Sequence, residues 1–376
     1  MPPPSLLLWR LGALGDTVLL LPTLAALRAA APERRLVLAG RPAYCAPALW
    51  QGLVDDVIDA ASPRLAALSH GDAPPPGALP DGLDGAVVWS RAHETIARGL
   101  RRAGLRHVVS APHLPPSPLA VSTYYAEAAA PFGSTPVAYR LEPPPYARLA
   151  SEGAWRRATT ARGDAGGPVV ILHPGAGSPA KRWPLDSFLA LAGALRGAGV
   201  CCCWTLGPAD ETLAGALEAA GEGAAVLTPP DLAALVAVVQ RAAVVVSADC
   251  GVAHVAALAS IPSVALFGPT DDRVWAPPSA RATVLRLVLP CAPCGEGMHA
   301  CPSHICLRLL PMRAVYAAVR TRLDGGESGV TEEGYRGPAD EPSWPGSGRF
   351  RSGAPVFQGA LQPRRLDIVH TTGAPR

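Results

Sequence analysis

Short apolar runs alternate with longer helical stretches through the second half of the chain, from residue 168 onward. The runs are almost continuously hydrophobic, which is typical of strands buried on both faces of a parallel sheet. Their alternation with helices predicts an α/β fold with a doubly wound sheet. The predicted strands are residues 169–173, 200–206, 224–227, 244–247, 263–267 and 283–287, and the predicted helices are residues 184–196, 210–220, 231–241 and 252–260.

The first half of the chain begins with the same alternation. Residues 5–9 and 35–40 predict strands, and residues 17–30 predict the helix between them. Asp16 precedes that helix and is its expected N-cap. Two further strands are predicted among proline-rich loops, at residues 86–89 and 107–110.

Breaks rich in proline and glycine divide the chain into segments. Two such breaks frame a predicted helix at residues 146–161, and after residue 323 the composition changes to Gly, Pro, Ser and charge. We therefore expect a first Rossmann-like domain at residues 1–145, an interdomain connection at 146–167, a second Rossmann-like domain at 168–323 and a disordered tail at 324–376.

Composition narrows the classes of function. The 376 residues exceed the usual size of one domain, and 49% hydrophobic with 17% charged residues is typical of a large buried core. A formal net charge of +3 gives no support for a nucleic-acid partner. The sequence has no apolar run of the ~20 residues that span a membrane and no basic leader at its start. We expect a cytoplasmic protein that could still touch a membrane surface.

The turn at residues 247–251 predicts an anion site. It lies between a strand and a helix, where free backbone N–H groups and the positive end of the helix dipole meet. Asp249 could accept from ribose hydroxyls or cap the helix, and Gly251 removes side-chain bulk where a phosphate would approach. His254 follows one turn later as a binding candidate, although a lone histidine is more often a packing residue. Gly268 and Thr270 follow the next predicted strand, residues 263–267, at the same edge of the sheet. There they could form one wall of the site, beside the base or sugar of a nucleotide.

A second glycine-rich turn, HPGAGSPAKRWP at residues 173–184, has the composition of a phosphate loop. Its small residues would admit an anion, and its two cations would neutralise it. The loop formally fits a dinucleotide fingerprint, but Pro179 interrupts the turn and no acidic residue closes the next strand. A solvated basic loop is the alternative. The candidate residues of this phosphate loop are Gly175, Gly177, Ser178, Lys181 and Arg182.

The first strand ends in the turn RLGALGD at residues 10–16. Two glycines allow a tight bend there, so a plain strand–helix turn capped by Asp16 is the simplest reading. Open α/β sheets, however, place their ligands at the carboxyl ends of strands. Asp16 would then be a carboxylate on the floor of the cleft, able to act as a general base.

Four cysteines, Cys291, Cys294, Cys301 and Cys306, cluster near His304. These residue types and spacings are compatible with structural zinc, and disulfides or free thiols are the alternatives. We assign the cluster no catalytic role.

These segments together resemble glycosyltransferase family nine, the bacterial lipopolysaccharide heptosyltransferases. The resemblance rests on four ordered stretches: RLGALGD at residues 10–16, HPGAGSPAKRWP at 173–184, SADCGVAHVAA at 247–257 and LFGPTD at 266–271. The cysteine-rich stretch is also similar to one found in many members. The resemblance implies a GT-B architecture, two Rossmann-like domains facing a central cleft. It also implies inverting transfer of a heptose from an ADP-sugar to a hydroxyl of the lipid A core, with no cofactor required for catalysis and a peripheral contact with the inner membrane.

Residue by residue, the resemblance makes Asp16 the catalytic base, with Arg10, Gly12 and Gly15 on the acceptor side. It places Lys181 on the donor phosphates, and Asp249, Cys250, Gly251 and His254 in the nucleotide-side turn. Cys250 departs from the family, which often has Thr at that position. Residues 60–120 align poorly and leave the acceptor open. The alternatives are a different nucleotide sugar, a catalytically silent sugar-nucleotide binder, and a nicotinamide-dependent oxidoreductase, which the failed fingerprint disfavours.

Overall fold

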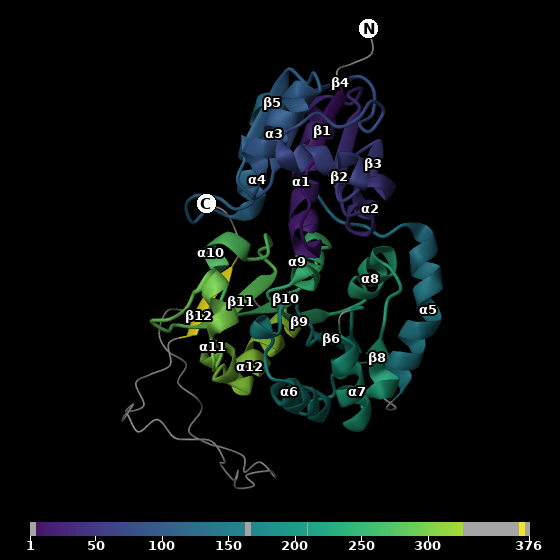
Figure 1. Cartoon of the computed structure of the whole chain (residues 1–376). Coiled ribbons are helices and arrows are strands. Elements are labelled where there is room, and N and C mark those ends of the chain that lie inside the picture. Colours follow the sequence, from purple (N-terminus) through teal and green to yellow (C-terminus); the bar gives the residue numbers. More distant parts are fainter. Residues whose placement is uncertain (1–4, 162–166, 209, 326–367, 373–376) are drawn as a thin grey trace.

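The computed structural model describes residues 5–161, 167–208, 210–325 and 368–372. Two α/β units lie end to end, with helices α1 and α9 meeting between them (Figure 1). The first unit contains a five-stranded parallel sheet of order β3-β2-β1-β4-β5. Its strands are β1 (Ser5–Trp9), β2 (Leu36–Gly40), β3 (Asp56–Asp59), β4 (Leu83–Trp89) and β5 (His107–Ala111).

The central strand β1 is buried on both faces because its side chains alternate between two cores. Leu6 and Leu8 pack into the core beneath α1, whereas Leu7 and Trp9 pack into the opposite core, beneath α3. The helices of this unit are α1 (Leu14–Ala30), α2 (Pro42–Trp50), α3 (His93–Arg102) and α4 (Val121–Ala129), with short 3₁₀ turns η1 (Pro63–His70) and η2 (Ala130–Phe132).

The second unit contains a seven-stranded sheet of order β12-β11-β10-β9-β6-β7-β8, parallel except for β12. The six strands that the apolar runs predict are all present. They are β6 (Val169–His173), β7 (Cys201–Thr205), β8 (Val226–Leu227), β9 (Val244–Ala248), β10 (Ser263–Phe267) and β11 (Ala282–Leu287). Two Rossmann-like units in one chain confirm the predicted fold class.

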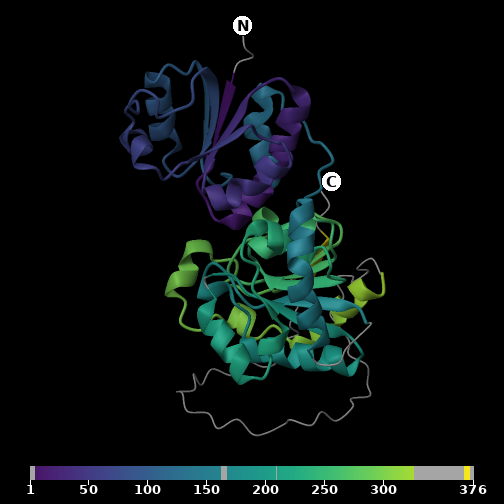
Figure 2. The ribbon, with the colours of Figure 1, turned by 90° about the vertical axis from the view of Figure 1, so that its right-hand side faces the viewer.

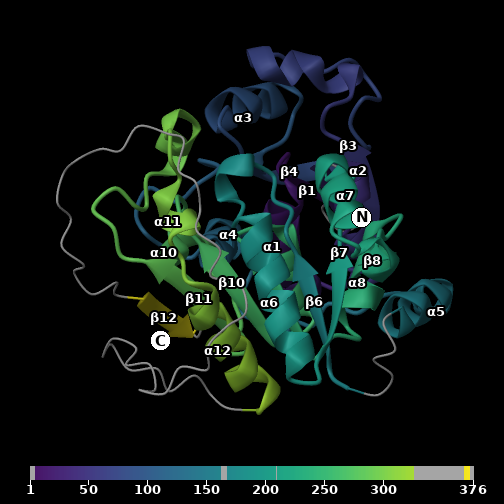
Figure 3. The same ribbon diagram turned by 90° about the horizontal axis from the view of Figure 1, so that it is seen from below.

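Helices cover both faces of the second sheet. On one face α6 and α12 pack side by side, as the view from below shows (Figure 3). The helices of this unit are α5 (Pro145–Thr160), α6 (Leu185–Gly197), α7 (Glu211–Ala219), α8 (Leu232–Val239), α9 (Gly251–Leu258), α10 (Asp272–Trp275), α11 (Ile305–Arg308) and α12 (Met312–Leu323), with 3₁₀ turns η3 (Pro179–Lys181), η4 (Gly223–Ala225) and η5 (Gly295–Ala300). None of the helices in the described ranges is long and apolar enough to cross a membrane.

Part of the predicted tail is a strand. Residues 368–372 form β12 (Ile368–Thr372), which pairs antiparallel with β11. The prediction of disorder is therefore wrong for residues 368–372, whose backbone pairs with the edge of a sheet that would otherwise expose unpaired groups. Residues 326–367 and 373–376 of that prediction lie outside the described residues.

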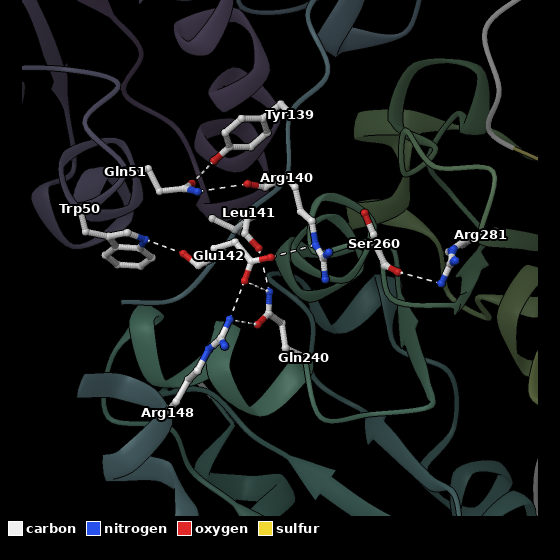
Figure 4. A network of polar contacts seen from close by, with 10 residues as sticks. All are labelled: Trp50, Gln51, Tyr139, Arg140, Leu141, Glu142, Arg148, Gln240, Ser260 and Arg281. Carbon is white, nitrogen blue, oxygen red and sulfur yellow. Dashed lines mark hydrogen bonds and ion pairs between the residues drawn. The ribbon is translucent and has the colours of Figure 1, made fainter. Parts of the chain in front are cut away.

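The contacts of α5 and of the segment before it indicate where the two units divide. Helix α5 packs against α8, β7 and β8 and runs along the second unit (Figure 2). The crossing segment lies before it and is tied to both sides (Figure 4). Trp50 Nε1 of the first unit donates to Glu142 O at 2.9 Å, and Leu141 N donates to Leu258 O of the second at 2.8 Å. The Glu142 carboxylate also accepts from Gln240 Nε2 at 2.8 Å. We therefore propose that the units divide before α5; the boundaries at residues 145 and 168 stay predictions.

Candidate functional site

A cleft of about 1060 Å³ lies between the two units, at the carboxyl ends of both sheets. This is where open α/β sheets place their ligands. Eleven of the predicted residues line it: Arg10, Gly12, Gly15, Asp16, Gly177, Lys181, Asp249, Cys250, Gly251, His254 and Thr270. The other four predicted residues, Gly175, Ser178, Arg182 and Gly268, are not among its lining residues.

Asp16 reaches the cleft from the third position of α1 and not from its N-cap. The helix begins at Leu14, so Ala13 is the N-cap residue. Asp16 Oδ2 accepts from Ala13 N at 2.7 Å, folding back on the start of its own helix. The prediction that Asp16 is the N-cap is wrong by three residues, because the helix already includes Leu14 and Gly15.

The other oxygen of Asp16 pairs with a buried cation. Arg10 Nη2 donates to Asp16 Oδ1 at 2.5 Å, and Arg10 Nε donates to Tyr125 Oη at 2.8 Å. Burial by itself would lower the pKa of Arg10, but Tyr125 and Asp16 raise it above its ordinary value. The guanidinium therefore stays charged although Arg10 is only 4% exposed. This network fixes the carboxylate at the edge of the cleft.

Across the cleft, Lys181 makes an ion pair with a buried carboxylate. Lys181 Nζ lies 2.9 Å from Asp249 Oδ2, and the two side chains are 24% and 5% exposed. Asp249 therefore orients the ammonium, which is the more accessible partner. The second predicted role of Asp249, capping the helix, is wrong because Cys250 is the N-cap residue of α9.

His254 lies behind this pair, with its Nε2 4.0 Å from Asp249 Oδ1. Burial lowers the pKa of His254, and the nearby carboxylates Asp249 and Asp16 oppose the change only in part. The ring is thus largely neutral near pH 7. Its Nδ1 is buried and has no hydrogen-bond partner among the described residues.

Two of the predicted glycines are contact points between the units. A Cβ at Gly251 would lie 2.6 Å from Leu14 Cγ, and a Cβ at Gly15 would lie 2.9 Å from His254 Cδ2. Real Cβ atoms do not approach so closely, so glycine is required where α1 meets α9. Gly251 therefore has a packing role against Leu14, and the suggestion that it also makes space for phosphate stays a prediction.

The segment between β7 and α7 contains a carboxylate that the sequence reasoning missed. Asp210 is 5% exposed, lines the cleft, accepts from Gly207 N at 2.9 Å and pairs with Arg182 Nη2 at 3.2 Å. A Cβ at Gly175 would meet the same carboxylate. Gly175 and Arg182 therefore shape the loop around Asp210. A polar residue just after a buried strand is the signal that could have identified it.

Ser178 and Gly268 also act on the local backbone and packing. Ser178 Oγ accepts from Ala180 N at 3.3 Å, which caps the short turn η3. A Cβ at Gly268 would lie 2.6 Å from Leu307 Cγ. The donor-binding role predicted for these two residues stays a prediction.

A cysteine–histidine pair at the carboxyl ends of adjacent strands was also missed. His173 ends β6 and Cys250 follows β9, and these two strands pair in parallel. His173 Nδ1 lies 2.8 Å from Thr205 O, and the ring lies close to the Cys250 thiol. Burial disfavours the charged form of both groups. Each charged group nevertheless stabilises the charge on the other, and this outweighs burial, so the pKa of His173 is raised and the pKa of Cys250 is lowered.

The cysteine-rich stretch does not assemble a metal site. Cys291 and Cys294 are exposed, Cys306 is buried, and His304 Nε2 faces Met298 O at 3.1 Å. Among the described residues, no group of three or more His, Cys, Asp or Glu is placed to hold a metal ion. The side chains present do not fit the structural zinc that the spacing suggested.

Comparisons with known protein sequences match this chain to one family. A sequence model described as "Glycosyltransferase family 9 (heptosyltransferase)" matches residues 78–302. A curated relative, lipopolysaccharide heptosyltransferase 1 of Pseudomonas aeruginosa, is 34% identical over 140 residues; the match spans 37% of this chain and 39% of the length of that relative.

Two solved structures share the fold. A glycosyl transferase family 9 protein from Veillonella parvula has a TM-score of 0.69 at 19% identity, covering 86% of this chain and 98% of its own. The ADP-heptose lps heptosyltransferase II of E. coli has a TM-score of 0.63 at 20% identity, covering 85% and 99%. At these identities the likeness shows the two-unit fold, which is that of the GT-B glycosyltransferases.

Proposed function

The chain belongs to glycosyltransferase family 9, and from that membership we propose that it transfers a heptose from ADP-heptose to a sugar hydroxyl of the lipopolysaccharide core. The observation that carries the proposal is that groups of opposite charge line one cleft from its two sides. A carboxylate, Asp16, lines the cleft from the first unit, and a cation, Lys181, lines it from the second. Displacement at an anomeric carbon needs a base on one side and charge stabilisation on the other.

Asp16 is the proposed base. Its two oxygens already accept from Ala13 N and Arg10 Nη2, and each keeps a second lone pair for an acceptor hydroxyl. A carboxylate is a weak base for an alcohol. It would therefore take the proton late, as the acceptor oxygen bonds to the anomeric carbon and the diphosphate leaves from the opposite face. That geometry inverts the anomeric centre.

The second unit would bind the leaving diphosphate. Lys181 is the accessible ammonium at this end of the cleft, and the amino end of α9 adds the positive end of a helix dipole. The neutral ring of His254 offers an unpaired nitrogen beside it. The first unit is thus the proposed acceptor side, and the second is the proposed donor side.

The acceptor determines the rest of the proposal. A hydroxyl of the lipid A core is anchored in a bilayer, so an enzyme that acts on it works at the membrane surface. We therefore include a peripheral contact with the inner membrane, on its cytoplasmic face, and a mechanism that needs no metal. The name of the Pseudomonas aeruginosa relative supports the acceptor class.

The test is a transfer assay with purified protein. ADP-heptose and a core acceptor lacking that heptose are supplied, and product is followed by mass spectrometry while ADP release is measured. We expect one heptosyl unit added per acceptor. Turnover only with another nucleotide sugar would replace the donor, and ADP-heptose binding without turnover with any acceptor would leave a silent binder.

A further inference from the structure

Cys250 lies where a thiolate is favoured. It is the N-cap residue of α9, a helix of eight residues, and it follows β9, whose neighbour β6 ends at His173. The two groups are close enough for each to shift the pKa of the other. The helix dipole and the backbone amides of Val252 and Ala253 favour negative charge on the sulfur. His173 is itself oriented by the Thr205 carbonyl, 2.8 Å from Nδ1. The arrangement is a base held beside a nucleophile.

Cys250 also borders the cleft. Cys250 is partly exposed and lines the cavity, together with His173 and Thr205. By contrast Cys45, Cys201, Cys202 and Cys203 are buried in the cores. Two buried groups of the same lining have no hydrogen-bond partner among the described residues, the hydroxyl of Thr205 and Nδ1 of His254. Polar groups left unpaired at the wall of a cavity indicate a place that receives a ligand.

We propose that Cys250, paired with His173 at the amino end of α9, is a nucleophilic thiolate that small disulfides modify, and that the adduct closes the anion-binding end of the cleft. In the reaction the thiolate sulfur attacks one sulfur of the disulfide. A new S–S bond forms as the old one breaks, and the other half leaves as a thiolate. Electrons balance because the disulfide is the oxidant. A reducing thiol reverses the step.

The charges around the pair are compatible with this reactivity. Asp210 lies near His173 and favours its protonated form. Next to Cys250 in the chain, Asp249 is neutralised by Lys181 at 2.9 Å. An anion bound at α9 would compete with the thiolate for the same helix dipole, so ligand and thiolate are expected to weaken one another.

The first experiment measures alkylation of the purified full chain by iodoacetamide at pH 6.0 and 8.0, with Cys250 followed by peptide mass mapping. An ordinary thiol with a pKa of about 8.5 reacts roughly 75-fold more slowly at the lower pH. We expect the Cys250 rate to fall by less than about 25-fold. A larger fall, or no label on Cys250 while exposed Cys291 reacts, would overturn the proposal. No nucleotide is present, so this result does not depend on the proposed function.

His173→Gln tests the partner. Gln cannot ionise, and we expect the fall in the Cys250 rate between pH 8.0 and 6.0 to become larger than in the wild type. An unchanged ratio would remove His173 from the pair.

The second experiment treats the protein with bis(2-hydroxyethyl) disulfide and measures ADP binding by calorimetry. This arm rests on the proposed function. We expect ADP binding to be lost, restored by dithiothreitol, and resistant to the disulfide in Cys250→Ser. An adduct on Cys250 that leaves ADP binding intact would overturn the closing of the cleft. If untreated protein does not bind ADP, the proposed function fails, and the alkylation ratio still decides whether the thiolate exists.

Discussion

Replacing Asp16 by Asn tests the proposed base, and the structure also predicts a cost in stability. The asparagine can accept from Ala13 N through its remaining oxygen, but its NH₂ group would then face the Arg10 guanidinium. Arg10 is 4% exposed and would keep only its hydrogen bond to Tyr125. Losing a charged hydrogen bond in such a place costs about 1–3 kcal/mol. Asp16→Asn should therefore be folded but less stable.

The catalytic loss should be larger. Removal of a general base costs about 10²–10⁴-fold in transfer rate, or roughly 3–5 kcal/mol of transition-state stabilisation. The assay compares kcat by ADP release, ADP affinity by calorimetry and stability by urea unfolding. Because Asp16 lies on the proposed acceptor side, ADP affinity should stay unchanged.

Tyr125→Phe is the matched control. It removes the other hydrogen bond of Arg10, at 2.8 Å, and leaves the carboxylate in place. The two variants should lose similar stability, about 1–3 kcal/mol, whereas Tyr125→Phe should lose less than about tenfold in kcat. Equal losses of kcat in both variants, or more than a tenth of the wild-type rate in Asp16→Asn, would show that Asp16 only positions Arg10.

Three further expectations follow from the cleft. Lys181→Ala should weaken ADP-heptose binding by at least about tenfold in a titration, because a charged contact is lost. Arg182→Ala removes the same charge from a residue that does not line the cleft, so it should weaken binding less. Equal effects of the two variants would contradict the phosphate role of Lys181. Gly251→Ala should lower the melting temperature because its Cβ strikes Leu14 Cγ at 2.6 Å, and adding Leu14→Ala should recover part of the loss; strictly additive losses would show that the contact is not the cause. Burial lowers the pKa of His254 in the folded protein, so the neutral ring stabilises the fold. This stabilisation is complete above the unfolded pKa of about 6.5 and is lost as the pH falls below that value. Melting curves between pH 7.5 and 5.5 should therefore show a smaller decline in melting temperature for His254→Gln than for the wild type.

Strands were predictable where the pattern was strong. Continuous apolar runs identified the six parallel strands of the second sheet because burial on both faces imposes that pattern. Strand β3 was missed because it is a short edge strand with Asp56 and Asp59 at its ends. Helix α2 contains Pro42 and Pro47, which read as a loop from sequence, yet Pro42 lies in its first turn. Strand β12 follows a long gap in the pattern, so nothing local joins it to β11.

The candidate site was predictable as a set of residues but not as a set of contacts. Asp16 follows a strand of the first sheet, whereas Lys181 and Asp249 follow strands of the second, so topology places each at the carboxyl edge of its own sheet. That the two edges face one cleft depends on how the units pack. The partners of these residues depend on tertiary packing. Arg10 meets Tyr125 across 115 positions of sequence, and no local pattern encodes that distance. His173 was visible in its motif, but its pairing with a cysteine required the order of the strands.

The contact between α1 and α9 connects the packing of the two units to the proposed chemistry. Gly15 and Gly251 let the helices approach until Leu14 and His254 fill the gap. The same two helices carry Asp16 and the turn beside Lys181, so the spacing of the glycines sets the separation between the proposed base and the proposed phosphate site. Displacement of a reacting group by ~1 Å can cost about 10²-fold in rate. A residue that contacts neither substrate can therefore affect the rate of transfer. Gly15 and Gly251 would do so by fixing the distance between the proposed base and the proposed phosphate site.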